Sequence, residues 1–363
     1  MFLPMLAVVL TVLFLLTFLP IALTRAARAA HAPSTPPALA DADRYSRRST
    51  ALAVLTGLGA AVAVALVWAL AERAYMYTAL AHTITDAATR PDDGELIIGQ
   101  LPPLLDLGLV LAPSVMGVVG LLVLLLRERR SPLVTTPTRT ASLTPRRPRD
   151  YVSLPFAVVA VLALVLLTSL LVIGTLTADA TGTAHTWEGT WHSASGPVQA
   201  TSTRTPWPGW VYSVPILLLT VAQLVLATTA LRDTAARGQL TSWADDAPDT
   251  DLDAALRRRS ADAVVGLLII AVSLPTIAAG LTMAPIAGDA LGSYPMLGRE
   301  YLALGVWALA CAGLALLALG AGTALMLRRP AVIRERLALD APLVTAPHSS
   351  APAATAPEGG EQS

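Results

Sequence analysis

Long apolar stretches alternate with short polar segments along almost the whole chain. A bilayer hydrocarbon core about 30 Å thick requires about 20 consecutive apolar residues in a helix. The pattern therefore predicts an all-α polytopic membrane protein with seven transmembrane helices. The seven stretches that reach this length are residues 2–23, 51–71, 105–126, 154–176, 210–231, 263–284 and 301–327.

The first stretch has the position of a secretory signal peptide but not its composition. Residues 1–4 carry no positive charge, and Arg25 and Arg28 follow the apolar run directly. The run is also longer than the roughly 7–15 apolar residues of a signal peptide. We therefore expect residues 1–23 to be a retained transmembrane anchor.

The arginines predict the orientation of the spans, because cytoplasmic loops of membrane proteins are enriched in basic residues. Segments 24–50, 127–153, 232–262 and 328–363 contain 21 of the 25 arginines, and the other connecting segments contain the remaining 4. This distribution predicts an N-terminus outside and a C-terminus in the cytoplasm.

The anchor is followed by three predicted transmembrane hairpins. They cover residues 51–126 with an outer loop at 72–104, residues 154–231 with a Trp-rich outer loop at 177–209, and residues 263–327. Segments 24–50, 127–153 and 232–262 are the predicted cytoplasmic loops. Residues 328–363 form a cytoplasmic tail whose end is rich in Ala, Pro, Gly and Glu and is expected to be disordered. Asp251 and Asp253, before an arginine run, predict a short helix leading into the sixth span.

Composition supports a membrane protein and excludes some kinds of chemistry. Hydrophobic residues make up 54% of the chain and charged residues 14%, against about 25% charged residues in soluble domains. All basic residues apart from histidine are Arg, and both Lys and Asn are absent. We interpret this as the coding bias of a high-GC bacterium, whose plasma (inner) membrane would hold the protein. Without Lys no retinal or pyridoxal phosphate Schiff base can form, and with Cys311 as the sole thiol no intrachain disulfide can form.

Ionisable residues are absent from the centres of the predicted spans. Such residues usually mark ion or proton pathways, so a pump that relies on a buried carboxylate is disfavoured. A haem held by two histidines within the spans has no ligands either, and we expect no cofactor and no metal site.

Gln223 is the polar residue of interest within a span. It either lines a substrate path or hydrogen-bonds a neighbouring helix, and the second role is favoured. Pro113, Pro215 and Pro275 interrupt three spans and could expose backbone groups along the same path, although proline in membrane helices usually only produces a kink.

The outer loop 177–209 contains His185, Trp187, Glu188, Trp191 and His192. A zinc site of His185, Glu188 and His192 is disfavoured, because on a strand the two histidines lie on opposite faces. Segments 183–192 and 198–205 instead predict a β-hairpin that forms a small extracellular cap. His185, Trp187 and Trp191 share one face of the first strand and form a candidate surface for a ligand or partner, although packing against the membrane or other loops is favoured. Trp210, and with less support Trp207, is assigned to the interfacial aromatic belt.

No catalytic, nucleotide-binding or nucleic-acid-binding motif occurs in the chain. We therefore expect a non-catalytic multi-pass protein in the lipid bilayer, acting as an accessory or assembly component that contacts other membrane subunits or a cytoplasmic ATPase. The alternative is a permease for a neutral or amphipathic solute. An enzyme or receptor that acts through its extracellular loops is a distant third hypothesis.

Overall fold

The computed structural model describes residues 47–67, 69–70, 107–129, 147–193, 196–237, 250–286 and 299–328. Within these ranges, six helices are long and apolar enough to cross a membrane. They are the helix Arg47–Val67, α3 (Leu107–Arg129), α4 (Leu154–Thr177), α5 (Trp210–Ala236), α6 (Thr250–Met283) and α8 (Arg299–Leu327). The predicted first span at 2–23, the whole outer loop 72–104 and the tail after residue 328 lie outside the described residues.

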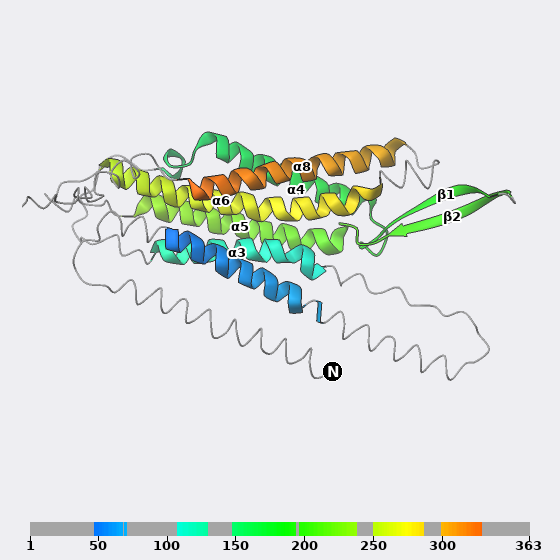
Figure 1. Cartoon of the computed structure of the whole chain (residues 1–363), viewed down its shortest axis with the longest axis horizontal. Coiled ribbons are helices and arrows are strands. Elements are labelled where there is room, and N and C mark those ends of the chain that lie inside the picture. Colours follow the sequence, from blue (N-terminus) through cyan, green and yellow to red (C-terminus); the bar gives the residue numbers. More distant parts are fainter. Residues whose placement is uncertain are drawn as a thin grey trace, which may run out of the picture.

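The six helices lie side by side along the long axis of the molecule (Figure 1). Gly57 lies against Met116, so the helix Arg47–Val67 packs on α3. Helix α6 occupies the centre of the bundle. In its most apolar 18-residue stretch 72% is buried inside the protein, against 17–50% in the corresponding stretches of the other five helices. It contacts α3, α4, α5 and α8.

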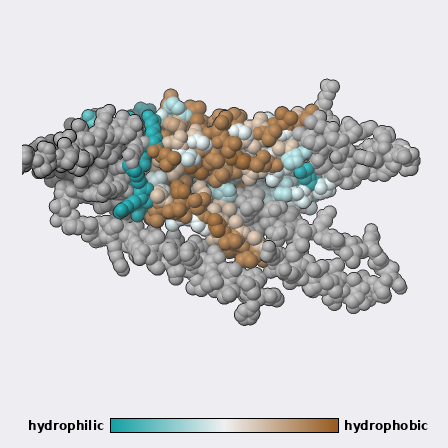
Figure 2. Space-filling model, viewed as in Figure 1, coloured by the Kyte–Doolittle hydropathy of each residue, from teal (hydrophilic) through white to brown (hydrophobic). Residues whose placement is uncertain are grey.

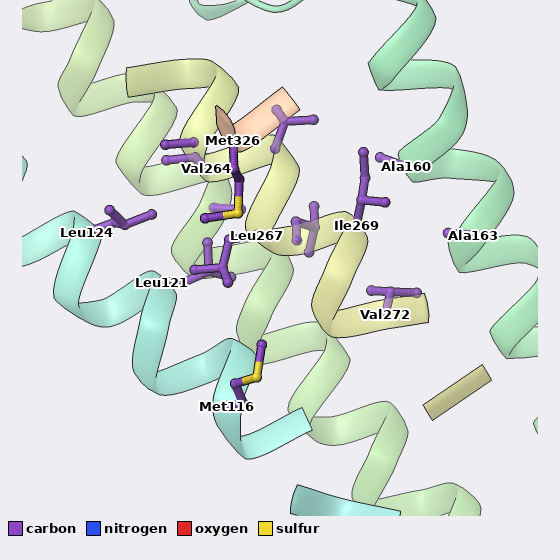
Figure 3. Close-up of a cluster of buried hydrophobic side chains, with 14 of the residues drawn as sticks. Met116, Leu121, Leu124, Ala160, Ala163, Val264, Leu267, Ile269, Val272 and Met326 are labelled. Atoms are coloured by element: carbon purple, nitrogen blue, oxygen red, sulfur yellow. The ribbon is translucent and has the colours of Figure 1, made fainter. Parts of the chain in front are cut away.

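Hydrophobic side chains from all six helices form the core around α6, and Figure 3 shows part of this cluster. Leu121 of α3 points toward Leu267 of α6, while Ile269 and Val272 face the side of α4 that carries Ala160 and Ala163. Leu121, Leu267 and Ile269 are completely buried. Burial of such side chains against one another, rather than against lipid, fixes which face of each helix points inward.

Small residues allow α6 and α8 to approach closely. A Cβ on Gly266 would lie 2.8 Å from the Gly322 carbonyl oxygen, and a Cβ on Gly280 would lie 2.7 Å from that of Ala308. These two contacts are 14 residues apart on both helices and define an antiparallel seam. Close approach through small residues is a common mode of packing between membrane helices.

The three prolines lie inside continuous helices, Pro113 in α3, Pro215 in α5 and Pro275 in α6. The short helix expected before the sixth span is the beginning of α6 itself, which runs without interruption for 34 residues. Asp251 and Asp253 lie in its first turn, as the sequence suggested.

A β-hairpin follows α4. Strands β1 (His185–Ser193) and β2 (Gly196–Arg204) pair antiparallel, with His185 opposite Arg204 and Ser193 opposite Gly196. The hairpin extends beyond the helix ends along the long axis (Figure 1). We call this end of the bundle the hairpin end.

The surface of the helices is apolar along their length, and hydrophilic residues gather toward the two ends (Figure 2). Large hydrophobic side chains such as Leu176, Leu218 and Leu317 are more than half exposed. This distribution is typical of a protein whose outer surface contacts lipid.

Candidate functional site

Gln223 lies at the centre of the bundle, where α3, α5 and α6 meet. Its side chain is completely buried. Its Nε2 donates a hydrogen bond of 2.8 Å to the backbone carbonyl oxygen of Ser114 in α3. The sequence favoured a hydrogen bond from Gln223 to a neighbouring helix over a role in a substrate path. The side chain makes such a bond, to α3.

The backbone around Gln223 is tightly packed. A Cβ on Gly117 would lie 2.3 Å from Ala271 Cβ and 2.6 Å from Gln223 Nε2. Only a glycine lets α3 come this close to both partners, because a real Cβ at these distances would clash. We call Ser114, Gly117, Gln223 and Ala271 the polar layer.

Two of the three prolines lie at the level of this layer. Gly117 faces Ala271 and Gly120 faces Leu267, so α3 and α6 run antiparallel. Pro113, four residues before Gly117, is therefore level with Pro275, four residues after Ala271. Pro215 is eight residues from Gln223 on α5, about 12 Å along the helix axis at about 1.5 Å per residue. The structure brings Gln223, Pro113 and Pro275 together and leaves Pro215 apart.

Aromatic rings pack together at the hairpin end. His185 stacks on Trp207 with ring centroids 4.7 Å apart, and the Tyr301 ring lies 5.8 Å from that of His185. The Trp207 side chain is completely buried, and its Nε1 donates to the Gly174 carbonyl oxygen and to Thr177 Oγ1, both at 3.1 Å. His185 Nδ1 also hydrogen-bonds the Thr177 carbonyl. Trp207 therefore joins the hairpin to the end of α4 and does not lie in an interfacial belt.

Of the three residues of the candidate outer-loop surface, His185 is the one whose side chain the structure describes. His185 is only 7% exposed, so its ring lies in the interior. Trp187 and Trp191 are at β1 positions opposite Ser202 and Val198, and their side chains lie outside the described residues. Among the described residues, no group of three His, Cys, Asp or Glu side chains is placed to hold a metal ion.

Asp179 shapes the turn between α4 and β1. Its Oδ1 accepts hydrogen bonds from Thr181 Oγ1 at 2.7 Å and from the backbone N–H of Gly182 at 3.1 Å. Partial burial acts to raise the pKa of this carboxyl, but the bonds from Thr181, Ala184, Gly182 and Thr183 lower it below its ordinary value of 3.8. Gly182 has a φ of +72° and lies directly against the Trp210 ring, which is 53% exposed at the start of α5.

Arginines and carboxylates link the helices at the opposite end. Here the helix Arg47–Val67, α4 and α6 begin and α3, α5 and α8 end; we call it the arginine-rich end. Two contacts between α3 and α5 are ion pairs, Arg129 to Asp233 at 2.7 Å and Arg237 to Glu128 at 3.1 Å. Arg127 donates to Ser49 Oγ at 2.8 Å, and Arg259 donates to the Arg328 carbonyl.

Arg257 is the most buried of these arginines, with 0% exposure. Its Nε donates to Asp253 at 2.8 Å, one turn earlier in α6. Its two terminal nitrogens donate to the carbonyl oxygens of Thr234, Ala235 and Arg237, each at 2.8 Å. A cation at the end of a helix satisfies carbonyls that lack partners within the helix and interacts favourably with its dipole. Arg257 thus joins the end of α5 to the beginning of α6.

The sequence analysis did not identify Arg257 or Trp207 as key contacts. A signal for Arg257 was present, because Asp253 precedes it by four residues, the spacing of an ion pair on one helix face. Arg258 has Ala254 four residues before it and is exposed. No protein-family model, curated protein or solved structure matches this chain.

Proposed function

We propose that this chain is a non-catalytic multi-pass membrane protein that acts as an accessory or assembly component of a membrane complex, such as a transport system with a cytoplasmic ATPase. The supporting observation is the use of interior polar groups. Gln223, Arg257 and Trp207 each bond to the backbone of another segment of the chain. Their polar groups serve contacts between segments, as expected of a structural component.

The proposed orientation places the arginine-rich end in the cytoplasm and the hairpin outside, with the anchor at 2–23 as the first of seven spans. It rests on the excess of arginine in the segments joined to that end. The hairpin, as a small extracellular cap, and the exposed arginines would then be the surfaces open to partners on the two sides of a bacterial inner membrane.

Single-cysteine labelling tests this orientation. Cys311 is the sole cysteine of the chain, so Cys311→Ala gives a background with no thiol. Its side chain is only 2% exposed, so the change leaves the surface of the protein as it is. Cysteines are then introduced at two exposed positions, Thr203→Cys in the hairpin and Arg258→Cys at the other end. A membrane-impermeant maleimide should label the first variant in intact cells and the second only after lysis. The opposite pattern would show that the protein is inserted the other way round.

Affinity purification from the native membrane in mild detergent, followed by mass spectrometry, tests the assembly role. A stoichiometric ATPase or membrane subunit is expected. Trp187→Ala with Trp191→Ala tests whether that partner binds the hairpin, and Trp210→Ala serves as the control at an exposed tryptophan outside it. A protein that purifies alone at native expression level would contradict the assembly role.

The alternative is a permease for a neutral or amphipathic solute, favoured by the alignment of Pro113, Pro275 and Gln223. Gln223→Leu should then abolish solute uptake at unchanged protein level. Uptake that persists in this variant would exclude a path through Gln223.

A further inference from the structure

Two buried side-chain atoms in the polar layer have no hydrogen-bond partner among the described residues. They are Ser114 Oγ and Gln223 Oε1, on residues that are completely buried. Several other buried hydroxyls donate to carbonyls of their own helix, as those of Thr220 and Thr276 do at 2.8 and 2.7 Å. A buried polar atom without a partner is costly, and such atoms commonly bind an internal water molecule.

Pro275 adds a backbone acceptor to the same layer. Proline has no N–H, so Pro275 cannot donate to the carbonyl of Ala271, four residues earlier. Ala271 lies directly against Gly117, next to the Gln223 amide. The layer therefore combines one hydroxyl donor with an amide oxygen and the Ala271 carbonyl as acceptors.

We propose that the polar layer is a binding site for ordered water that bridges α3, α5 and α6. One water molecule has two donors and accepts further bonds. It would donate to Gln223 Oε1 and to the Ala271 carbonyl, and it would accept a bond from the Ser114 hydroxyl. These three groups come from three different helices, so the water completes the contact that the Gln223 to Ser114 bond begins.

The close packing limits the size of the ligand. A single Cβ added at Gly117 would already lie 2.3 Å from Ala271 Cβ. A solute with several heavy atoms would have to separate α3 from α6, whereas a water molecule only needs two to four polar partners. Water is the smallest molecule that offers both donors and acceptors to these groups.

Ser114→Ala tests the proposal against a matched control, Ser273→Ala. The Ser273 hydroxyl is also completely buried and without a partner among the described residues. On α6 it is midway in sequence between Gly266, which contacts Gly322 of α8, and Gly280, which contacts Ala308 of α8. Both changes remove one buried hydroxyl from a helix, and among the described residues Ser114 is the one of the two that bonds through its backbone to a side chain with another unsatisfied atom.

The two variants should change stability in different ways. Ser114→Ala leaves the water short of a partner, and we expect the equilibrium constant for unfolding in mixed micelles to rise about 3- to 15-fold. Ser273→Ala removes a hydroxyl that has no partner, so its constant should stay the same or fall. If Ser114→Ala behaves like Ser273→Ala, the layer is dry, or the hydroxyl turns to the carbonyl of Val110 in its own helix, and the proposal is wrong.

A double-mutant cycle with Gln223→Met provides a second measurement. Among the described residues, the Gln223 amide bonds the backbone of Ser114, which Ser114→Ala leaves in place. A molecule that bridges the two side chains would couple their effects on stability. We expect the combined effect on the unfolding constant to be smaller than the product of the single effects, and independent effects would overturn the proposal. If Gln223→Met does not fold, the two serine variants alone decide.

Discussion

Arg257→Met removes the group that joins the end of α5 to the start of α6. The wild-type guanidinium donates one hydrogen bond to the Asp253 carboxylate and three to backbone carbonyls, and it is completely buried. Methionine has a similar length but no donor. The variant therefore removes the bond between Arg257 and a carboxylate that is only 3% exposed, together with the bonds to three carbonyls.

The expected cost follows from these lost contacts. Removing one partner of a buried ion pair typically costs about 3–5 kcal/mol, because the remaining charge stays desolvated. The carbonyls lie at the end of a helix, where water can replace part of the lost bonding, so we expect a value of about 3 kcal/mol in the free energy of unfolding. Asp253→Asn should cost less, since the guanidinium keeps its three carbonyl partners.

Reversible unfolding in mixed micelles, followed by tryptophan fluorescence, measures these differences. Arg258→Met is the matched control, because Arg258 is the next residue and is exposed. Its effect should stay within about 0.5 kcal/mol. Equal losses for Arg257→Met and Arg258→Met would refute the reasoning, because burial and bonding of the guanidinium would then contribute nothing to stability.

Two further predictions concern the close helix seam and the turn after α4. Gly280→Ala places a Cβ 2.7 Å from the Ala308 carbonyl oxygen and should cost about 1–3 kcal/mol in the same unfolding assay, whereas Gly320→Ala, with no atom within 4 Å, should be neutral or stabilising. Equal effects would show that α6 and α8 do not pack closely. Asp179 has a folded-state pKa below 3.8, so its carboxylate stabilises the fold above that pH, and this contribution is lost as the pH falls through the folded pKa. The stability difference between wild type and Asp179→Asn should therefore shrink below about pH 4, and a difference that does not vary with pH would contradict the assignment.

The spans could be predicted from the sequence because a helix that crosses the hydrocarbon core needs about 20 consecutive apolar residues, and such runs are visible in the hydropathy of the chain. Each predicted span from 51–71 onward corresponds to a helix in the structure. The ends were less accurate: α5 continues to Ala236, and α6 begins at Thr250. Charged residues ended the predicted spans, but the helices continue because residues such as Asp233 and Arg257 find partners on neighbouring helices.

The packing could not be predicted in the same way. In a soluble helix the polar face marks the outside, but in a membrane helix the lipid-facing side is as apolar as the core. Leu167 and Leu162 of α4 illustrate this, because the first is completely buried and the second is 47% exposed. Gln223 was the one residue whose inward direction could be expected from the sequence, since a lone amide among apolar residues must find a hydrogen-bond partner within the bundle.

The position of α6 bears on the choice between an assembly component and a carrier. This one helix carries Arg257 at one end, Ala271 and Pro275 at the polar layer, and Gly280 in the seam with α8. Moving it relative to its neighbours would break the carbonyl bonds to α5, separate Gly117 from Ala271 and open the seam at the same time. A carrier must change its helix packing during each cycle, and this central helix makes close contacts at three levels. These contacts are an argument for the proposed assembly component over the alternative carrier.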